Sequence, residues 1–380
     1  MIHRLLTSKL RSARKSCLVL GPRQTGKSTL IKTLAPELTI NLAAESEFFR
    51  FSSDPHLLES VLAERGPQTV FIDEIQRIPS LLNTIQATVD ESASAPKFFL
   101  SGSSVRKLRR GQANLLPGRI FTYELSGLCA KELEYEIDLD RALACGMLPE
   151  PYLAPNLVES TKLLRSYAST YLKEEIQAET LVRNIQGFAR FLNTAAAVSG
   201  KICDFSKIST KSKVSRTGVL RFVEILEDTL IAQRVDVFDE AEDADVIKHP
   251  KLYFFDVGVL NGLLGNFEPS PDRLGLLHEH FVYSQLRNSA MAHDEPIDIR
   301  YFRTRHGLEV DFIVKLRNRI WAIEVKSGEI ASADLESLRG FRRYYPRVHR
   351  CVAVGMREKK RSIDGLLICN WNDLLREMEL

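Results

Sequence analysis

The sequence predicts a multidomain α/β protein, and three short stretches carry that prediction. A glycine-rich loop at residues 21–28 lies between an apolar segment and a helical pattern. A second apolar segment ends in two acids, Asp73 and Glu74. Near the other end of the chain, the segments 309–314 and 320–327 alternate as paired strands do. At 380 residues the chain is long enough for two or three separate cores.

The composition excludes several broad classes of protein. Hydrophobic residues make up 44% and charged residues 27% of the chain, a balance typical of folded globular proteins. The formal net charge is only +3, so a surface for nucleic acid would have to be local. The six cysteines contain no C-x-x-C pair, which argues against a zinc ribbon or a disulfide framework. No segment has the roughly 18 apolar residues of a membrane helix. We therefore expect a cytoplasmic protein with no membrane partner.

Residues 21–28, GPRQTGKS, predict a nucleotide-binding loop. They form the pattern G-x-x-x-x-G-K-S, with an apolar strand before it and a helix after it. Gly21 and Gly26 let the backbone N–H groups point at phosphate oxygens, Lys27 reaches the terminal phosphates, and Ser28 ligates Mg²⁺. ATP and Mg²⁺ are therefore the expected cofactors. The predicted nucleotide-binding residues are Gly21, Pro22, Arg23, Gln24, Thr25, Gly26, Lys27, Ser28 and Thr29.

The second stretch, TVFIDE at 69–74, predicts hydrolysis as well as binding. Its apolar part reads as a buried parallel strand, and α/β sheets carry their chemistry at the carboxyl ends of such strands. We expect Asp73 to hold Mg²⁺ through water and Glu74 to orient and deprotonate the attacking water. A third strand, at 97–100, precedes Ser101, which we expect to sense the γ-phosphate. The alternative for Ser101 is an ordinary turn serine.

Arg119 is a candidate for catalysis between subunits. It stands directly before a strand that begins at Ile120, at a corner that lies near the subunit edge in ring ATPases. From there it could reach the γ-phosphate of a neighbour. Arg106, Arg109 and Arg110 are rival candidates, and a surface arginine is the alternative. The role requires a homo-oligomer, and we expect a ring.

These motifs together resemble a known family. GPRQTGKSTL, FIDEIQRIPSLLNTIQATVDE, FFLSGSS and LLPGRI occur in this order, as in the bacterial and archaeal AAA+ ATPases that carry a C-terminal domain of unknown function. The resemblance continues through GMLPEPYLAP, HPKLYFFDVGVL, GLEVDFIV and IEVKSG, so it covers nearly the whole chain. It implies an ATPase core with a helical lid, a winged helix and a nuclease-like C-terminal domain, but no settled biological role.

The middle of the chain is predicted to be helical. Residues 126–184 have an amphipathic helical pattern, typical of a lid over the nucleotide or of a connecting bundle. Residues 204–226 read as helix, turn, helix, with an apolar stripe on the second helix. Arg216 and Arg221 lie on its other face and Lys213 at its entry, a charge pattern that suits contact with a DNA backbone. Docking to a protein is the alternative, and no residue set for reading base edges is evident.

The two alternating strands of the last third predict a second metal site. A hairpin turn at Arg317–Asn318 pairs residues equally distant from the turn, which places Asp311 opposite Glu324. Like charges directly opposite each other destabilise a sheet, so a cation between them would explain the pair. Glu279 is a third acid, on the apolar side of a preceding helix, where a carboxylate needs a partner.

These acids and Lys326 match the D…E-x-K pattern of the PD-(D/E)XK nuclease-like fold. In that fold Glu279, Asp311 and Glu324 would hold Mg²⁺, and Lys326 would position or activate the attacking water. Two alternatives stay open. In one, Lys326 only neutralises the acids; in the other, the domain binds nucleic acid without cutting it.

The sequence therefore predicts four domains. They are an AAA+ P-loop ATPase core at 1–125, a helical lid at 126–184, a winged helix-turn-helix at 185–250 and a PD-(D/E)XK nuclease-like α/β domain at 251–380. The favoured function is an ATP-hydrolysing DNA motor or remodeller that acts on repair or branched DNA. Two other functions stay open: an ATP-gated switch that binds a protein through its C-terminal domains, and an ATP-dependent metal nuclease.

Overall fold

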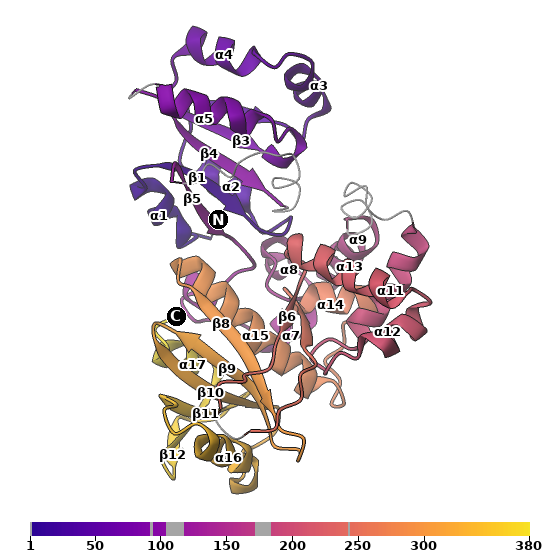
Figure 1. The fold of residues 1–380 in the computed structure, drawn as a ribbon. Helices are drawn as coiled ribbons and strands as arrows, with labels where there is room; N and C mark the ends of the chain where they lie inside the picture. The colour runs from indigo at the N-terminus through magenta and orange to yellow at the C-terminus, as the bar shows by residue number, and fades with distance from the viewer. Residues whose placement is uncertain (1, 92–93, 104–117, 172–183, 242–243) are drawn as a thin grey trace. The chain divides into compact units, whose positions relative to one another are not determined.

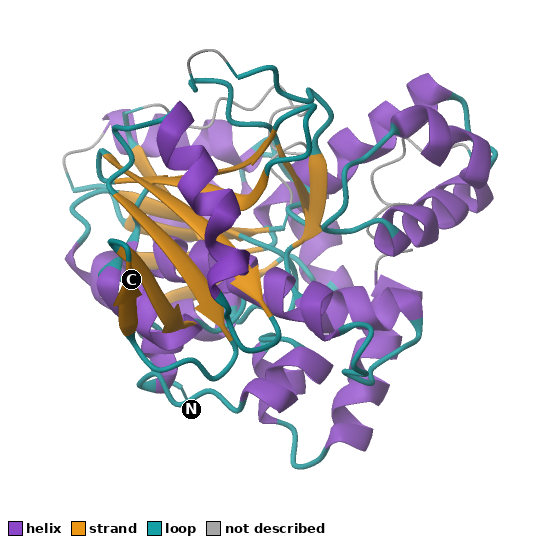
Figure 2. Cartoon of the chain, turned by 90° about the horizontal axis from the view of Figure 1, so that it is seen from below, coloured by secondary structure: helices purple, strands orange, loops and turns teal. Residues whose placement is uncertain are grey.

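The computed structural model describes residues 2–91, 94–103, 118–171, 184–241 and 244–380 (Figure 1). The chain forms two compact units, one of residues 1–126 with 228–231 and the other of residues 127–227 with 232–380. Figure 2 shows the helices and strands of the same chain. Arg106, Arg109, Arg110 and residues 172–183 of the predicted lid lie outside the described residues.

The first unit contains a five-stranded parallel sheet in the order β2-β3-β4-β1-β5. Parallel strands that are covered on both faces read as continuous apolar runs, and the centres of β3 and β4 are buried in this way. The elements of this unit are α1 (Leu6–Ser12), β1 (Ser16–Leu20), α2 (Lys27–Lys32), β2 (Leu38–Asn41), α3 (Glu45–Ser53), α4 (Leu57–Arg65), β3 (Thr69–Asp73), η1 (Ile75–Arg77), α5 (Leu81–Glu91), β4 (Lys97–Gly102) and β5 (Ile120–Glu124).

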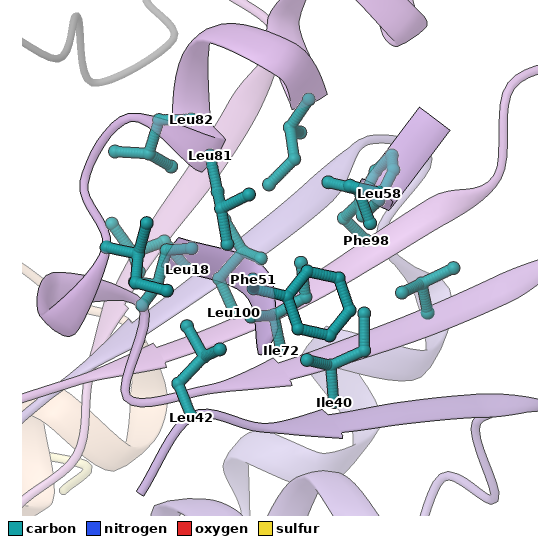
Figure 3. Packing of buried hydrophobic residues seen from close by; sticks show 14 of the residues in the cluster. Leu18, Ile40, Leu42, Phe51, Leu58, Ile72, Leu81, Leu82, Phe98 and Leu100 are labelled. Carbon is teal, nitrogen blue, oxygen red and sulfur yellow. The ribbon is translucent and has the colours of Figure 1, made fainter. Parts of the chain in front are cut away.

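Two apolar clusters cover the two faces of this sheet. Strand β1 contributes Leu18 and Leu20 to one cluster and Cys17 and Val19 to the other, because successive side chains of a strand point to opposite faces. The first cluster joins the sheet to α3, α4 and α5 (Figure 3). The second joins it to α1 and α2. This burial on both faces fixes the strands side by side, and with them the loops at their carboxyl ends.

The second unit begins with helices. They are η2 (Ala130–Leu133), α7 (Leu139–Cys145), α8 (Pro149–Leu153), α9 (Leu157–Ser166), η3 (Tyr167–Tyr171), α11 (Ile185–Ala197), α12 (Phe205–Ser212), α13 (Arg216–Asp228) and α14 (Val257–Leu264). The predicted helix, turn, helix is confirmed as α12 and α13, and Ser215 caps α13 through a hydrogen bond from Gly218 N to its Oγ at 3.2 Å. Two antiparallel strands, β6 (Ala232–Val235) and β7 (Lys251–Phe254), lie between α13 and α14 in the chain.

A six-stranded sheet forms the rest of the second unit, in the order β12-β13-β11-β10-β9-β8. Helix α15 packs against β10, and α16 packs against β9, β10 and β11. The elements are α15 (Leu274–His293), β8 (Ile297–Arg303), β9 (Glu309–Leu316), β10 (Arg319–Lys326), η4 (Ser332–Leu335), α16 (Glu336–Tyr344), β11 (Arg350–Gly355), β12 (Arg361–Ile363), β13 (Leu366–Asn370) and α17 (Trp371–Glu377).

The predicted hairpin between β9 and β10 is confirmed. Arg317 and Asn318 have φ values of 47° and 62°, the left-handed pair that a two-residue hairpin turn requires. The pairing has the predicted register from Arg319 with Leu316 to Ile323 with Phe312. The next pair would be Glu324 with Asp311, but there the Asp311 carboxylate accepts the backbone N–H of Val325 at 2.8 Å. The register therefore brings the two acids to the end of the paired region.

The cysteines and the longest helices of the described residues relate to two expectations drawn from the composition. All six cysteines are free and buried, as the absence of paired spacing predicts. Within the described ranges, no helix combines the length and apolarity needed to cross a membrane.

Candidate functional site

The loop between β1 and α2 has a backbone that only certain residues can adopt. Gly26 has a φ of 90° and Gln24 a φ of 59°, both in the left-handed region. A side chain on Gly21 would bring its Cβ within 1.9 Å of the Leu125 carbonyl oxygen. The two glycines of the motif are therefore required by the path of the chain, and that path wraps the loop around the start of α2.

Lys27 is held by its own loop. Its Nζ donates to the carbonyl oxygens of Gly21 and Pro22, each at 2.9 Å, and the residue is 5% exposed. A buried ammonium needs such partners. Phosphate oxygens in the loop would compete with these carbonyls for the same donor, which fits the predicted contact with ATP.

Ser28, Asp73 and Ser101 meet at the carboxyl ends of neighbouring strands. The Ser28 hydroxyl donates to Asp73 Oδ1 at 2.8 Å, and the Ser101 hydroxyl donates to the same oxygen. Ser101 reaches Asp73 because β4 lies between β1 and β3. A hydroxyl and a carboxylate beside a phosphate-binding loop are ligands that Mg²⁺ takes in nucleotide sites, so these residues fit the predicted ion.

Glu74 is held in position by Ser101 and by a residue that the sequence did not indicate, Gln76. Its φ of 58° is unusual for a residue other than glycine, and such strain is common at functional sites. Its N–H donates to Ser101 Oγ at 3.1 Å, and its carboxylate accepts a hydrogen bond from Gln76 Nε2. Gln76 Nε2 also donates to Ser103 Oγ at 3.0 Å. A glutamine two residues after the predicted catalytic acid has no motif of its own, so this contact could be found only in the fold.

Arg4 is a second residue that sequence reasoning missed. Its guanidinium donates to the carbonyl oxygens of Thr25 at 2.7 Å and Ser126 at 3.0 Å, and the residue is buried. Thr25 is also buried, and its hydroxyl donates to Pro22 O at 2.9 Å. Arg4 thus braces the phosphate loop against the end of the first unit. The basic N-terminal segment carries no signal for this contact, because its two partners lie far along the chain.

Arg119 lies at the opposite edge of the sheet from the phosphate loop. The parallel pairing of β1 and β5 begins at Ser16 with Ile120, so Arg119 precedes the amino end of the sheet, whereas the loop follows Leu20 at the carboxyl end. Five strand residues separate the two edges by roughly 16 Å. Arg119 Nε lies 2.5 Å from Asp90 Oδ1. An Arg119 that acts on a γ-phosphate therefore needs the loop of a second chain.

The three DNA-binding candidates are exposed on the helix–turn–helix. Lys213 has a φ of 53° in the turn, Arg216 begins α13, and Arg221 lies one and a half turns further along the same helix. Their charges are the surface feature that the sequence predicts for contact with a nucleic-acid backbone.

The acidic segment after β6 runs along β8. Phe238 N donates to Tyr301 O at 2.7 Å. Asp239 forms an ion pair with Arg300 at 3.7 Å, and Asp245 forms one with Arg305 at 3.3 Å. Basic residues at and just after β8 therefore lie against these acids.

The four predicted residues of the second site lie in one region of the second unit. Lys326 Nζ donates to Glu324 Oε1 at 2.8 Å. Burial, and after it the charge of Asp311, raises the pKa of Glu279 and of Glu324 to about 7. Burial also raises the pKa of Asp311. The predicted acids are thus close enough to disfavour one another's charges.

A lysine that the sequence did not indicate lies among these acids. Lys251, on β7, is 3% exposed, and its Nζ lies 3.0 Å from Glu309 Oε1 and 3.5 Å from Glu279 Oε1. Tyr253, on the same strand, donates to Glu279. We call Glu279, Glu309, Asp311 and Glu324 the carboxylate cluster. In the part of the chain that the structure describes, no three His, Cys, Asp or Glu side chains are arranged to hold a metal ion.

Three family models match successive parts of the chain. Residues 13–134 match an AAA domain, residues 136–270 a domain of unknown function (DUF8612) and residues 274–374 another domain of unknown function (DUF4143). The DUF4143 match covers all six strands of the six-stranded sheet, and its description assigns no activity to the carboxylate cluster.

Similar proteins cover most of the chain. Uncharacterized proteins of Mycobacterium tuberculosis and Mycobacterium bovis are each 28% identical over 317 residues, which is 81% of this chain and 69% of theirs. A solved structure of the replication initiator DnaA, bound to AMPPCP and single-stranded DNA, is 13% identical and covers 58% of this chain and 85% of that chain. Its TM-score of 0.26 is too low to carry an argument. The match of residues 13–134 and the geometry of the loop and its acids together support an AAA-type ATPase.

Proposed function

We propose that this protein is an ATP-hydrolysing AAA+ protein that acts on DNA as an oligomeric motor or remodeller. The observation that carries ATP hydrolysis is the network in which Ser28 and Ser101 both donate to Asp73, directly beside the phosphate loop. This network joins the ends of three neighbouring strands, where parallel α/β sheets bind ligands.

In this proposal, different residues of the first unit have different roles in ATP hydrolysis. Backbone N–H groups of residues 21–29 and the Lys27 ammonium bind the phosphates. Ser28 and Asp73 would hold Mg²⁺, which would supply positive charge to the bound phosphates. Glu74 orients the attacking water and accepts its proton, and Ser101 senses the γ-phosphate beside it. The hydrogen bond from Gln76 supports this role, because it fixes the carboxylate that must meet the water.

Arg119 supplies positive charge to the γ-phosphate of a neighbouring subunit in this proposal. Its position at the far edge of its own sheet supports action on a second chain rather than on its own loop. A closed ring of identical subunits would give every loop one such arginine.

The helix–turn–helix is the proposed DNA contact, as part of a winged helix completed by β6 and β7. Lys213, Arg216 and Arg221 are exposed and would meet phosphates rather than base edges. The ion pairs of the acidic segment with Arg300 and Arg305 support this proposal, because they give those acids a partner other than α13.

ATP turnover in the presence of different DNAs tests the proposal. We expect single-stranded, duplex or branched DNA to raise the turnover rate of the full chain. Arg216→Glu with Arg221→Glu should lose this stimulation and keep basal turnover, because both side chains are exposed in the second unit. Lys162→Glu is the matched control, since it reverses an exposed charge on another helix of the same unit. Each lost phosphate contact should also reduce the salt dependence of DNA binding by roughly one unit of slope.

The same measurement distinguishes the DNA role from the alternative in which the protein binds a protein partner. Turnover that no DNA changes, in a chain that still hydrolyses ATP, would remove the DNA role. The ATP-gated switch would then be the better account of the same ATPase. Turnover that is absent under all conditions would remove the ATPase itself.

A metal-dependent nuclease is the second candidate function. The observation in its favour is that the β9–β10 register brings Asp311 and Glu324 to the same end of the paired region and that Lys326 contacts Glu324. Glu279 and these two acids would hold Mg²⁺ or Mn²⁺, and Lys326 would direct the water at a phosphodiester. Metal-dependent cutting of DNA that Asp311→Asn abolishes would support it. DNA that stays intact with either metal would leave a domain that binds without cutting.

A further inference from the structure

The ammonium group of Lys251 is buried beside three acids of the carboxylate cluster, Glu279, Glu309 and Asp311. It lies 3.0 Å from Glu309 and 3.5 Å from Glu279, and the ring of Tyr301 lies 5.4 Å from it. Lys251 is buried, with only 3% of its surface exposed to solvent. Charges are buried at this depth only when paired, so the acids and the lysine stabilise each other. The cluster thus already contains one cation.

The backbone fixes Lys251 in this position. On one side it pairs with Val235 of β6, and on the other it forms a bridge with Ile202. Tyr253 follows two residues later on the same face of β7 and donates to Glu279. Glu279 therefore receives two contacts from one strand that is itself held on both sides. The backbone of Lys251 is therefore fixed, and its buried side chain starts from a fixed position.

The charges of the cluster favour a divalent cation over the lysine. Its four carboxylates face three cationic groups, Lys251, Lys326 and Arg303. With all of these ionised, one negative charge is in excess. A divalent cation in the place of the Lys251 ammonium would leave the cluster neutral, whereas one added beside it would make the cluster positive. Glu324 also has a buried oxygen, Oε2, that accepts no hydrogen bond. A cation ligand would satisfy it.

We infer that Lys251 closes a divalent-cation site formed by Glu279, Asp311 and Glu324, and that this site binds Mg²⁺ or Mn²⁺ when the lysine is removed or displaced. This inference rests on the metal role proposed above for these three acids. It adds a regulatory element to that role, because the protein carries the competitor of the metal within its own β7 strand.

Mn²⁺ binding to the full chain tests the inference. All proteins carry Asp73→Asn and are free of nucleotide, so that the ATP site lacks both the phosphates and the carboxylate proposed to hold its metal. Free Mn²⁺ is measured by electron paramagnetic resonance. We expect Lys251→Met to bind Mn²⁺ more tightly than its parent by roughly tenfold or more, because a unit charge about 4 Å away no longer repels the ion. Lys251→Arg, which keeps the charge, should resemble the parent, and Glu324→Gln added to Lys251→Met should abolish the gain.

Folding is monitored in the same proteins. The only two tryptophans of the chain, Trp321 and Trp371, both lie in the second unit, so their fluorescence reports its unfolding. Mn²⁺ should raise the melting temperature of Lys251→Met and leave that of Lys251→Arg unchanged. If Lys251→Met does not fold, amine labelling of Lys251 in the parent replaces it. Saturating Mn²⁺ should then expose Lys251 to the reagent, and Glu324→Gln should prevent this.

Three outcomes would overturn the inference. They are equal Mn²⁺ affinity of folded Lys251→Met and its parent, a gain in affinity that survives Glu324→Gln, and labelling of Lys251 that Mn²⁺ does not change. The DNA-stimulated turnover of the protein with Asp73 intact is measured separately. If DNA did not stimulate turnover, the proposed DNA function would be removed, but the result would say nothing about Mn²⁺ binding. If DNA stimulated turnover and Lys251→Met did not bind Mn²⁺ more tightly, only the role of Lys251 would be removed.

Discussion

Replacing Gln76 with leucine tests whether the Glu74 carboxylate, the proposed catalytic group, must be held by a side chain. Gln76 Nε2 donates both to Glu74 and to Ser103 Oγ, and the residue is 4% exposed. Its Oε1 is buried and accepts no hydrogen bond, so the loss of that oxygen leaves no donor unpaired. Leucine fills a similar volume. The substitution therefore removes the two hydrogen bonds and little else.

The expected effect follows from the strength of one hydrogen bond. A bond to a charged group contributes roughly 1.5–3 kcal/mol. If all of it holds the Glu74 carboxylate in its productive position, its loss slows hydrolysis by roughly 10- to 150-fold. The φ of 58° at Glu74 makes the tether more necessary, because a strained backbone relaxes once its restraints are removed. ATP binding should change little, because the described hydrogen bonds of Gln76 do not reach the phosphate loop.

Steady-state ATP turnover and nucleotide affinity together form the assay. We expect Gln76→Leu to lower kcat and to leave the Kd for ATP unchanged. Ile75→Val is the matched control, because it removes one methyl group from the neighbouring residue, which is fully buried, and touches no hydrogen bond of Glu74. A purely structural loss would lower kcat and thermal stability to a similar extent in both variants.

One result would refute the reasoning about Gln76. If Gln76→Leu hydrolysed ATP at the wild-type rate, the hydrogen bond from the Glu74 backbone N–H to Ser101 Oγ and the strand itself would suffice to position the carboxylate. Gln76 would then be a buried polar residue of the fold, with no share in catalysis.

Three further predictions concern the nucleotide site, assembly and pH. Lys27→Ala should lose ATP binding, whereas Glu74→Gln should bind ATP and hydrolyse it about 10² to 10⁴ times more slowly, as equilibrium binding and turnover would show. Arg119→Ala should bind ATP without hydrolysing it and regain turnover when mixed with Lys27→Ala, and a fully active monomer would contradict this. Burial lowers the pKa of His280 to about 4, so the folded state stays neutral where the unfolded state binds a proton. The free energy of unfolding should therefore fall between pH 6.5 and 4, by on the order of 3 kcal/mol for this residue. In tryptophan fluorescence His280→Gln should reduce that fall, and an unchanged pH profile would refute the assignment.

The parts of the fold that could be predicted from the sequence are those whose conformation is determined by residues close together in the chain. The phosphate loop is one, because its whole motif lies within residues 21–28 and the local backbone, with a φ of 90°, demands a glycine at position 26. The β9–β10 hairpin is another, because a two-residue turn at Arg317 and Asn318 sets the register of every pair that follows. In both cases the physical cause and its consequence lie in one short segment.

The contacts that could not be predicted from the sequence join segments that lie far apart in the chain and meet only in the folded protein. Arg4 contacts Ser126, which lies 122 residues away, and Lys251 of β7 contacts Glu309 of β9. Neither residue belongs to a motif, and a lone basic residue is common on any surface. The order of the strands has the same character. That β4 separates β1 from β3, and so carries Ser101 to Asp73, depends on packing between segments and leaves no pattern in any one of them.

The two lysines of the carboxylate cluster differ in the property that separates a reactive group from a counter-ion. The Lys326 side chain is 33% exposed and contacts one carboxylate, whereas Lys251 is 3% exposed and lies between two. A lysine that directs water at a phosphodiester must be reachable by the substrate, but a lysine that only balances buried charge need not be. Lys251 already serves as counter-ion to Glu279, so that acid does not require Lys326 for its neutralisation. This difference favours Lys326 as the water-directing group in the proposed nuclease-like site, with Lys251 as the group that must leave before a metal can enter.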